Sequence, residues 1–471
     1  MIILSFNSRG LGSFLKQKAI QGLISQHKAD FVCIQETKLQ VVDVHCCRTI
    51  WGDVDFDWRF APSENRGGGL LCIWRKGLLQ VERSIIESNF ICIVGSFGVD
   101  AADCAVLNVY APCDRVGKRQ LWSKLVELKI NIHYDLWCVA GDFNVVRSSS
   151  ERRGVGANSQ QHRSESVEFN DFIDEMELLD IPLLGRKFTW VRPNGLQMSR
   201  LDRFLISPGW LNRWPDYVQE VLQRDILDHC PLLFKRVNQN WGPKPFRVLN
   251  CWFDDPRFQA FVGDSWREIQ VEGRGIIALN EKLKTLKLKL KQWNLEVFGN
   301  LHRRKKEIVD QLNDIEKKAE ESDLQEVELR QRQELGAEFW QCSKRIDSLA
   351  YQKSRINWIR EGDQNSRYFH AIVNFRRKVN ALPGLWVEDV WVDDPSAVKF
   401  QAKEFFACKF KSMERWRPKL NGVPFRSLSV SSSKLLEENF SAAELKEAVW
   451  SCAGDKSPGP DGINFRFIKS F

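Results

Sequence analysis

Between residue 1 and about residue 237, the chain alternates short apolar runs with turn-forming residues. Six runs have the length and composition of buried strands, at residues 2–6, 31–34, 69–74, 90–97, 105–110 and 136–140. The spacing becomes helical between some of them, at residues 16–27, 119–132 and 168–179. This mixture of strands and helices predicts an α/β domain with buried sheets.

The pattern changes after residues 238–246, which are rich in Asn, Gly and Pro and which we interpret as a domain boundary. A helical hairpin is predicted next, with a break near Gly299 and Asn300; an intermolecular coiled coil is the alternative. The reason is a heptad pattern of apolar residues at alternating spacings of four and three. Its members are Leu279, Leu283, Leu286, Leu290, Trp293, Val297 and Leu301, then Ile308, Leu312 and Ile315.

These changes divide the chain into three expected domains, at residues 1–236, 237–380 and 381–471. The middle one is a basic helical connector. Its end, residues 351–380, has seven basic residues against two acidic ones, with Trp358, Tyr368 and Phe369 among them. Positive charge interleaved with aromatic rings is typical of a surface that contacts nucleic acid.

The overall composition permits a nucleic-acid partner without selecting one. Lys and Arg number 69 and Asp and Glu 61, for a net charge of +8 and a pI of about 8.8. The 13 cysteines include no C-x₂-C pair, so we expect no zinc site and a reducing, intracellular compartment. No run approaches the ~20 apolar residues that span a bilayer, so we expect no membrane partner.

Residues that suit phosphodiester cleavage follow several of the expected strands. Such cleavage needs a metal to neutralise charge on the phosphorane, a group that deprotonates water, and stabilisation of the leaving oxygen. Carboxylate and amide oxygens are the ligands that Mg²⁺ prefers. Each residue alone is more often a turn former or a helix cap. As an ordered set they are more informative: Asn7, Glu36, Tyr110, Asp142, Asn144, Asp202, Asp228 and His229.

The stretches around these residues resemble the exonuclease–endonuclease–phosphatase superfamily and, within it, the endonuclease of plant LINE-type (non-long-terminal-repeat) retrotransposon proteins. They are SFNSRGLG from Ser5, CIQETKL from Cys33, GGGLLCIW from Gly67, NVYAPC from Asn108, GDFNVV from Gly141, GRKFTWV from Gly185, SRLDRFLIS from Ser199 and LDHCPLL from Leu227. Four later stretches resemble the connector and the reverse-transcriptase onset of the same element proteins. They are GPKPFR from Gly242, FGN from Phe298, WIREGDQNSRYFH from Trp358 and DKSPGPDG from Asp455.

The resemblance implies a four-layer αββα sandwich for the first domain, followed by the helical connector and an incomplete reverse-transcriptase fragment. It implies an Mg²⁺-dependent endonuclease, with Mn²⁺ as the alternative ion, that nicks DNA. Element RNA is a second expected partner, through the basic connector. An enzyme that nicks genomic DNA is expected in the nucleus, at least transiently. The oligomeric state is not predicted.

The family's metal site, carried over by motif, falls on three residues. Glu36 would be the main metal carboxylate, and Asn7 and Asp228 would complete the metal environment. Two nearby residues depart from the family pattern: Phe6 stands where these elements usually have Trp, and Leu227 where Ser usually precedes Asp-His-Cys-Pro. A missing hydroxyl at Leu227 would loosen the Asp228 loop.

The resemblance also implies the catalytic roles. Asp142 would orient and deprotonate the attacking water, and Asn144 would help hold that water or the phosphate. His229, held by Asp202, would contact the scissile phosphate and stabilise charge there. Tyr110 would steady the phosphorane or the leaving oxygen. The Asp–His pair has independent physical sense, because a neighbouring carboxylate raises the pKa of a histidine and favours its cationic form near an anion.

Two other classes of function stay open. The first is another enzyme on the same fold, such as an apurinic-site repair nuclease or a phosphoesterase, because fold alone does not decide function. The second is a non-catalytic nucleic-acid-binding remnant of a decayed element. The connector motifs favour the element endonuclease over the first alternative, and the intact acidic set favours it over the second.

We expect no reverse-transcriptase activity from this chain. WFDD from Trp252 and WVDD from Trp391 resemble the paired aspartates of a polymerase, but each precedes DKSPGPDG and is followed by proline, so we interpret them as turn or surface acids. Only ten residues follow Asp461, too few for a palm. The segment after Ala381 is therefore expected to be poorly ordered. Four apolar residues are expected to lack packing partners: Ile463, Phe465, Phe467 and Ile468.

Overall fold

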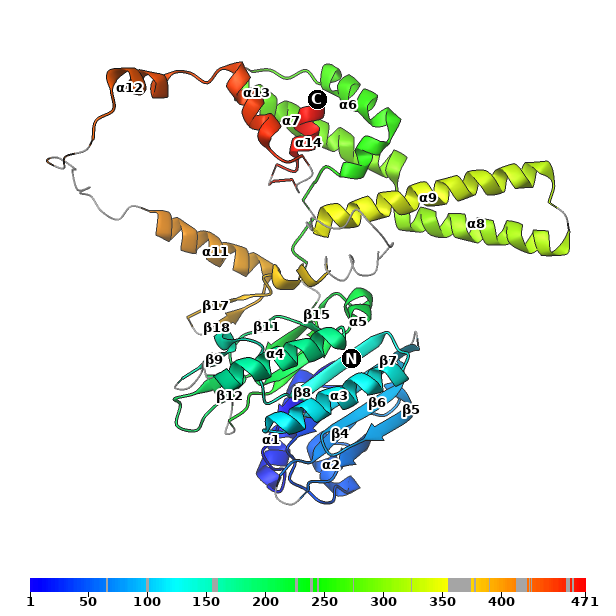
Figure 1. Cartoon of the computed structure of the whole chain (residues 1–471), viewed down its shortest axis with the longest axis vertical. Coiled ribbons are helices and arrows are strands. Elements are labelled where there is room, and N and C mark those ends of the chain that lie inside the picture. Colours follow the sequence, from blue (N-terminus) through cyan, green and yellow to red (C-terminus); the bar gives the residue numbers. More distant parts are fainter. Residues whose placement is uncertain are drawn as a thin grey trace. The chain divides into compact units, whose positions relative to one another are not determined.

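The computed structural model of the chain divides into two compact units (Figure 1). One comprises Met1–Asn240 with Asn374–Glu404, and the other comprises Trp241–Val373 with Phe405–Phe471. The described residues are 1–471 except 65–66, 99–100, 155–159, 225–227, 238–239, 244, 274, 323, 355–373, 377, 389, 412–421, 423, 425, 455–457 and 460. Leu227 and the aromatic residues Trp358, Tyr368 and Phe369 lie outside this described part, as does half of the DKSPGPDG stretch.

Two large sheets form the body of the first unit. A seven-stranded sheet has the order β11-β15-β16-β1-β2-β4-β3, and a six-stranded sheet has the order β10-β14-β8-β7-β6-β5. The strands of the first are β1 Ile3–Asn7, β2 Phe31–Gln35, β3 Phe56–Ala61, β4 Leu70–Arg75, β11 Leu183–Leu184, β15 Tyr217–Val221 and β16 Leu232–Arg236. Those of the second are β5 Leu79–Ile86, β6 Phe90–Phe97, β7 Ala102–Tyr110, β8 Leu136–Asp142, β10 Leu179–Asp180 and β14 Asp202–Ile206.

Helices and short strands complete this unit. The helices are α1 Phe14–His27, α2 Val44–Trp51, α3 Arg115–Asn131, α4 Gln160–Glu175 and α5 Pro208–Arg213, with the 3₁₀ turn η1 Ser149–Glu151. A small sheet has the order β12-β13-β9, with β12 Trp190–Val191, β13 Met198–Ser199 and β9 Arg152–Arg153. The segment Asn374–Glu404 adds the hairpin β17 Leu385–Val387 and β18 Val390–Val392.

The layers follow from the alternation of side chains along the strands, because successive residues point to opposite faces. In β2, Phe31 and Cys33 lie in a core shared by the two sheets, whereas Val32 and Ile34 pack in a second core with Ile20 of α1. A third core lies between the other sheet and α3 and α4. Helices therefore cover the outer faces of two packed sheets. The predicted α/β class and the four-layer αββα sandwich are confirmed.

Most of the predicted strands and helices in this unit are confirmed, and one helix is displaced. Residues 168–179 were expected to be helical, but α4 runs from Gln160 to Glu175. Glu177 has a φ of +47°, which a helix cannot continue through, and β10 begins at Leu179. The apolar spacing persists past the helix end because Leu178 is buried in the same core as Phe172.

A segment far along the chain packs against this first unit. Phe375 contacts the core between the two sheets, and the Asn374 side chain donates a hydrogen bond to Asn212 Oδ1 at 2.9 Å. The Lys378 ammonium donates to the main-chain oxygen of Tyr217. The first compact unit therefore takes in residues that the sequence divides between the connector and the last segment.

The second unit is helical and contains a hairpin of two long helices. Its elements are η2 Asn250–Asp254, α6 Pro256–Glu268, α7 Gly275–Trp293, the π-helical turn η3 Asn294–Phe298, α8 Leu301–Glu321, α9 Glu326–Ser354, α13 Ala442–Ser451 and α14 Phe465–Ser470. Helices α8 and α9 lie side by side (Figure 1). Ile308 and Ile315 of α8 share a core with Leu335 and Ile346 of α9. The predicted break near Gly299 is present, but the hairpin is formed by α8 and α9 and not by the two sides of that break. Among the stripe residues whose side chains the structure describes, Leu279 is exposed.

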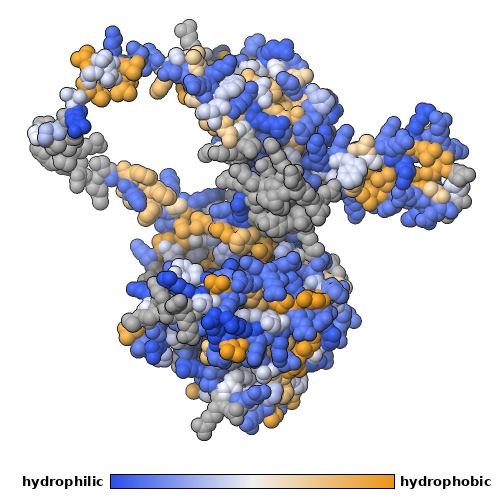
Figure 2. All heavy atoms as spheres, viewed as in Figure 1, coloured by the Kyte–Doolittle hydropathy of each residue, from blue (hydrophilic) through white to orange (hydrophobic). Residues whose placement is uncertain are grey.

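The expectation that the last apolar residues lack partners is wrong for two of the four. Ile463 and Phe467 are buried in the core of the helical unit, whereas Phe465 and Ile468 are exposed. Gly462 lies against Phe246, and its main-chain oxygen accepts a 2.9 Å hydrogen bond from the amide of Val248. Gly462 and the segment from Phe246 to Val248 are therefore neighbours in space. Two helices earlier in this last segment have exposed apolar side chains. They are α11 Pro395–Phe410 and α12 Val430–Glu437 (Figure 2).

The second residue of each aspartate pair caps a helix, in agreement with the interpretation of the pairs as turn or surface acids. Asp255 accepts a 3.0 Å hydrogen bond from the amide of Arg257 at the start of α6. Asp394 accepts one of 2.8 Å from the amide of Ala397 at the start of α11. In the part of the chain that the structure describes, no helix has the length and apolar content needed to cross a membrane.

Candidate active site

The predicted site residues meet at one edge of the sandwich because of strand direction. β1 and β2 are parallel, so Asn7 and Gln35 lie side by side at their carboxyl ends, with Glu36 directly following. In the other sheet β7 and β8 are also parallel, which places Tyr110 beside Asp142. β14 runs antiparallel to β8 and begins at the same edge.

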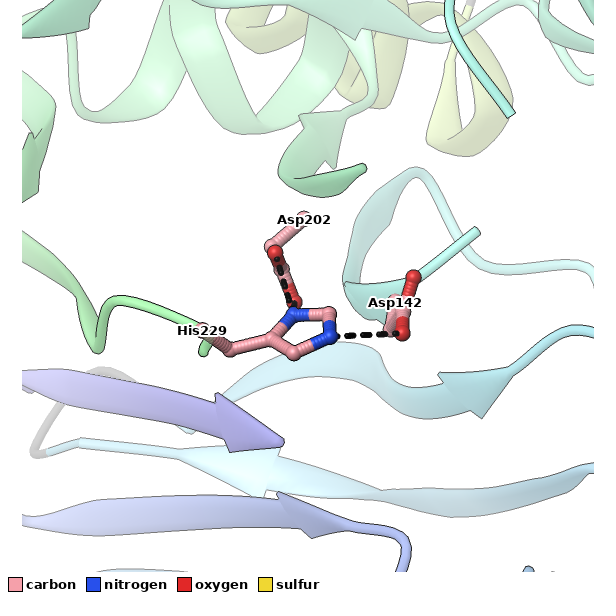
Figure 3. A group of neighbouring side chains, drawn as sticks. All are labelled: Asp142, Asp202 and His229. Carbon is pink, nitrogen blue, oxygen red and sulfur yellow. Dashed lines mark hydrogen bonds and ion pairs between the residues drawn. The ribbon is translucent and has the colours of Figure 1, made fainter. Parts of the chain in front are cut away.

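The centre of the site is a buried chain of three ionisable side chains (Figure 3). Asp202 is the antiparallel partner of Asp142, and both are almost fully buried. The imidazole of His229 lies between them, with Nδ1 at 3.0 and 3.1 Å from the two Asp202 oxygens. Its Nε2 lies 3.8 Å from Asp142 Oδ2. That distance is too long for a hydrogen bond but within the range of an ion pair, so the hydrogen-bonding capacity of Nε2 is not used by Asp142.

Opposing influences set the protonation of this chain. Burial by itself would lower the pKa of His229, but the carboxylates of Asp202 and Asp142 outweigh it and raise that pKa to about 9. Burial and the charge of Asp202 raise the pKa of Asp142 to about 6, against the lowering effect of His229. Near pH 7 the site therefore holds a cationic imidazole beside a mostly ionised Asp142.

Two amides fix the orientation of the Asp142 carboxylate. The Asn7 side chain donates to Oδ2 at 2.9 Å, and the main-chain amide of Asn144 donates to Oδ1 at 2.9 Å. The Asn144 side chain donates at 2.7 Å to the main-chain oxygen of Ala111, so it ties this turn to the end of β7. No residue with a Cβ fits at position 141 of the strand, because that Cβ would lie 1.9 Å from the main-chain oxygen of Val109.

The Glu36 loop is held by the three-glycine stretch. Glu36 has a φ of +53°, a left-handed conformation uncommon for residues other than glycine. The following amides, of Thr37 and Lys38, each donate at 3.0 Å to the main-chain oxygens of Gly69 and Gly68. Gly69 has a φ of +84°, and a Cβ there would lie 2.3 Å from Thr37 Oγ1. The triple glycine therefore shapes the loop that presents Glu36.

Both carboxylates predicted to bind metal form an ion pair with a basic side chain in this structure. Lys38 Nζ lies 2.9 Å from Glu36 Oε1, and Arg9 Nη1 lies 2.5 Å from Asp228 Oδ2. Trp190 Nε1 also donates to Asp228 Oδ2, at 3.2 Å. Asp228 Oδ1 is buried and has no hydrogen-bond partner among the described residues. An unsatisfied buried carboxylate oxygen is unfavourable unless a ligand completes it.

The donor set fits a hard divalent cation. Glu36, Asn7 and Asp228 offer carboxylate and amide oxygens, the ligands that Mg²⁺ prefers, and the unpartnered Asp228 Oδ1 leaves one of them free. A second group that could hold an ion comprises Asp142, Asp202 and His229, whose ligand atoms lie within 4.8 Å of one another. We favour the first set, because His229 Nδ1 is committed to Asp202 and a cationic imidazole binds no metal.

Tyr110 closes the site from the end of β7. Burial, then the charges of Glu36 and Asp142, raise the pKa of its hydroxyl well above the usual value. The phenol therefore stays protonated and can donate a hydrogen bond near both carboxylates. All eight predicted residues thus lie at this edge of the sandwich, in the loops and strand ends around Asp142.

The sequence prediction missed the residues that hold this group in place. Thr189 is fully buried, and its hydroxyl accepts hydrogen bonds from the amides of Leu201 and Asp202 at 3.0 and 3.1 Å. Its main-chain oxygen accepts a 2.7 Å bond from the amide of Cys230, next to His229. Thr189 therefore binds the Asp202 and His229 segments together. The GRKFTWV stretch contains it, but nothing in that pattern marks a support for catalytic residues.

A second missed element links the two sheets beneath the site. Gln35 Nε2 donates to Asn108 Oδ1 at 2.6 Å, and the Asn108 amide group donates at 3.1 and 3.2 Å to the main-chain oxygens of Ile34 and Leu71. Both side chains are fully buried. Because Gln35 precedes Glu36 and Asn108 lies near Tyr110, this bridge fixes the two halves of the site relative to each other.

A pocket of about 400 Å³ opens beside His229 and Asn144. Three cationic side chains line it, Lys118, Arg152 and Arg153, and the Lys118 ammonium pairs with buried Glu165 at 2.8 Å. Trp190 and Leu201 supply apolar surface.

The chain from residue 4 to residue 229 matches the family model described as Endonuclease/Exonuclease/phosphatase family. The match contains all eight candidate site residues. The matched residues all lie in the sandwich. The helical unit lies outside it.

The chain is also similar to particular proteins. The Transposon TX1 uncharacterized 149 kDa protein of Xenopus laevis is 24% identical over 386 residues, 78% of this chain and 29% of that protein. An exodeoxyribonuclease of Bacillus subtilis (strain 168) is 22% identical over 258 residues, 49% of this chain and 98% of that protein. This chain thus spans less than a third of the transposon protein. One similar solved structure is the endonuclease domain of TRAS1, a telomere-specific non-LTR retrotransposon, with 11% identity, a TM-score of 0.38 and coverage of 50% of this chain and 97% of that one.

Proposed function

We propose that this protein is an Mg²⁺-dependent endonuclease that nicks DNA, with Mn²⁺ as an alternative ion. The observation that carries the proposal is the buried chain from Asp202 through His229 to Asp142, with a 3.8 Å gap between Nε2 and the Asp142 oxygen. It offers a cationic donor and a carboxylate base facing the same place. Hydrolysis of a phosphodiester needs that pair of functions on either side of the reacting phosphate.

Each residue has a role in this proposal. Asp142, oriented by Asn7 and the Asn144 amide, accepts the proton of the attacking water. The protonated His229 donates its Nε2 proton in a hydrogen bond to a phosphate oxygen, and Asp202 holds the ring through Nδ1. Asn144 positions the water or the phosphate, and Tyr110, protonated at neutral pH, donates to the phosphorane or to the leaving oxygen.

Glu36, Asn7 and Asp228 would hold the metal. When bound, a divalent cation there supplies Lewis-acid stabilisation of the negative charge that builds on the phosphate. The protein's own contribution is to place hard oxygen donors at the strand ends through the Glu36 loop and the Thr189 support.

The comparison with the transposon protein supports an element origin, since the similarity extends over 78% of this chain and past the sandwich. We propose that the substrate is target DNA, nicked to prime reverse transcription, and that element RNA binds the basic connector. An enzyme with this role acts in the nucleus, at least transiently. The cationic pocket beside His229 favours a DNA strand over a small phosphoester.

A second candidate is removal of nucleotides from DNA ends. The similarity to an exodeoxyribonuclease, which covers 98% of that protein, favours it over other enzymes of this fold. The two activities leave different products. Nicking needs no free end, whereas stepwise removal does.

The deciding experiment uses the full chain with supercoiled plasmid and with an end-labelled linear duplex. Nicking of the plasmid in Mg²⁺ or Mn²⁺, and none in EDTA, is the expected result. Equal cutting in EDTA would contradict the metal role. Shortening of the labelled duplex without plasmid nicking would replace the endonuclease with the exonuclease.

A further inference from the structure

Two basic side chains occupy the carboxylates that the proposed function assigns to the metal. Arg9 pairs with Asp228 at 2.5 Å, and Lys38 pairs with Glu36 at 2.9 Å. In each pair the cation is much more exposed than the carboxylate. The side chains of Arg9 and Lys38 are 49% and 37% exposed, against 10% and 16% for Asp228 and Glu36. The cations can therefore leave without disturbing a packed core.

A third cation in the same place, Lys16, is held differently. Its Nζ donates to the main-chain oxygens of Ser8, Arg9 and Gly10 at 3.1, 3.0 and 3.0 Å. Burial and then the charge of Lys38 lower the pKa of Lys16, with Arg9 adding to the effect. Lys16 is thus committed to the main chain of the loop. Arg9 and Lys38 are committed to carboxylates that a divalent cation would also take.

The backbone aims both cations at the site. Arg9 and Lys38 have φ angles of +46° and +54°, in the left-handed region, and Glu36 has one of +53°. The two loops are joined by a 2.7 Å hydrogen bond from the Gly10 amide to the Glu36 main-chain oxygen. Three non-glycine residues in this conformation within two paired loops are unfavourable, and such backbone strain concentrates at functional positions.

The charges explain why exchange is favourable. Glu36 and Asp228 are largely buried, and without a counter-ion they would carry uncompensated negative charge. A divalent cation supplies that compensation with two charges at one point. Arg9 and Lys38 would then be surplus positive charge beside a polyanionic substrate. Phosphate oxygens are the preferred partners of such guanidinium and ammonium groups.

We propose that Arg9 and Lys38 are exchangeable counter-ions of the site. They neutralise Asp228 and Glu36 in the absence of a divalent cation, and they bind phosphates of the DNA strand when the cation is present. The inference rests on the proposed function for the identity of metal and substrate, and it adds two phosphate-binding residues that metal binding releases. It also makes metal and DNA binding mutually reinforcing, because each ligand favours the same arrangement of these side chains.

The first test measures Mn²⁺ binding to the full chain by calorimetry, without DNA. Arg9→Gln and Lys38→Gln each remove a competitor, so each is expected to tighten Mn²⁺ binding, on the order of 5-fold per removed cation. The matched control is Lys76→Gln. Lys76 is exposed and follows β4 at the end of the sheet opposite Glu36, because Trp74 pairs with Phe31 at the start of β2. It should leave Mn²⁺ affinity unchanged.

The second test separates exchange from simple charge removal. DNA affinity is measured against salt concentration, in EDTA and in Ca²⁺, for the full chain and for the Arg9→Gln/Lys38→Gln variant. Each cation–phosphate contact adds about one unit to the slope of log affinity against log salt. Ca²⁺ should steepen the slope by about two units in the parent protein and leave it unchanged in the double variant.

The outcomes distinguish this inference from the proposed function. If the parent protein binds Mn²⁺ but neither variant binds it more tightly, or if both proteins show the same Ca²⁺ effect on the salt slope, the exchange is contradicted and the endonuclease proposal stands. If the parent protein binds no Mn²⁺, the metal role and the exchange fail together. Tighter Mn²⁺ binding with a lost slope change supports the exchange.

Discussion

The interior of the candidate site and its rim use the same kinds of charged residue in opposite ways. In the interior, Asp142, Asp202 and His229 are nearly sealed from solvent, and their contacts hold each other in one arrangement. At the rim, Arg9 and Lys38 are largely exposed and each meets a carboxylate. The difference indicates that burial fixes the groups that move protons, while exposure keeps the groups that bind ligands replaceable.

Removing the interior groups should have the largest effect. His229→Ala and Asp142→Ala are each expected to lower the nicking rate by about 10²–10⁴-fold, because one removes the phosphate-facing cation and the other the base. Plasmid nicking by the full chain measures this. His133→Ala, an exposed histidine elsewhere in the same unit, is the control. Near-normal nicking by a folded His229→Ala variant would contradict the assigned role.

The interior should also set the pH dependence. Asp142 must be ionised to accept a proton, so nicking should rise as pH increases through about 6. His229 must be protonated to donate, so nicking should fall as pH increases through about 9. Asp202 raises the pKa of His229, so Asp202→Asn should move the alkaline limb to lower pH. An alkaline limb that does not move would exclude His229 as the group that titrates there.

A smaller loss is expected from a change behind the rim. Gly69→Ala would place a Cβ against Thr37 in the loop that presents Glu36, and a misplaced ligand costs about 10–10²-fold in rate. Gly98→Ala is a matched control, because Gly98 has a similar φ of +76° but open space around it. Nicking rates of the two variants, compared at equal thermal stability, separate loop placement from backbone strain. Equal losses in both would remove the argument for the triple glycine.

The smallest effect on nicking is expected outside the sandwich. Asp255→Ala removes the cap of α6 and its contacts with Arg257, which should lower the free energy of unfolding of the helical unit by about 1 kcal/mol. Nicking should stay unchanged, because Asp255 caps a helix and is not assigned to the metal site. Denaturant unfolding and plasmid nicking test the two statements separately. A loss of nicking would connect the helical unit to catalysis.

The α/β class of the first domain was predictable because its signals are local, whereas its four-layer form followed only from the family resemblance. Strands such as β6 show as apolar runs of strand length, and parallel neighbours must bring their carboxyl ends to one edge. Asn7, Glu36, Tyr110 and Asp142 therefore met as expected. The relation between the two sheets was not predictable, since the Gln35–Asn108 bridge joins residues 73 positions apart through two ordinary amides.

The supporting contacts escaped prediction for a related reason. Thr189 acts through its hydroxyl on two amides that only tertiary packing brings near it. The packing partners of Ile463 and Phe467 lie in helices that precede them by more than a hundred residues. The apolar residues at the end of the sequence therefore did not indicate that they pack in a core. Patterns along the chain locate elements and strand ends. They do not specify which distant surfaces close on them.

The contact of Asn464 with Asn250, 214 positions away, has a consequence for the order of events during synthesis. Closing so long a loop costs entropy that grows only with the logarithm of its length, so the contact is compatible with a stable unit. It cannot form, however, until the last helix has been translated. At ~5–20 residues per second, roughly 10–50 s separate the emergence of the strands up to Arg236 from that moment. Every strand of the two sheets is therefore synthesised before the helical core can be completed. During that interval the apolar surface of the helical unit would be accessible to a chaperone.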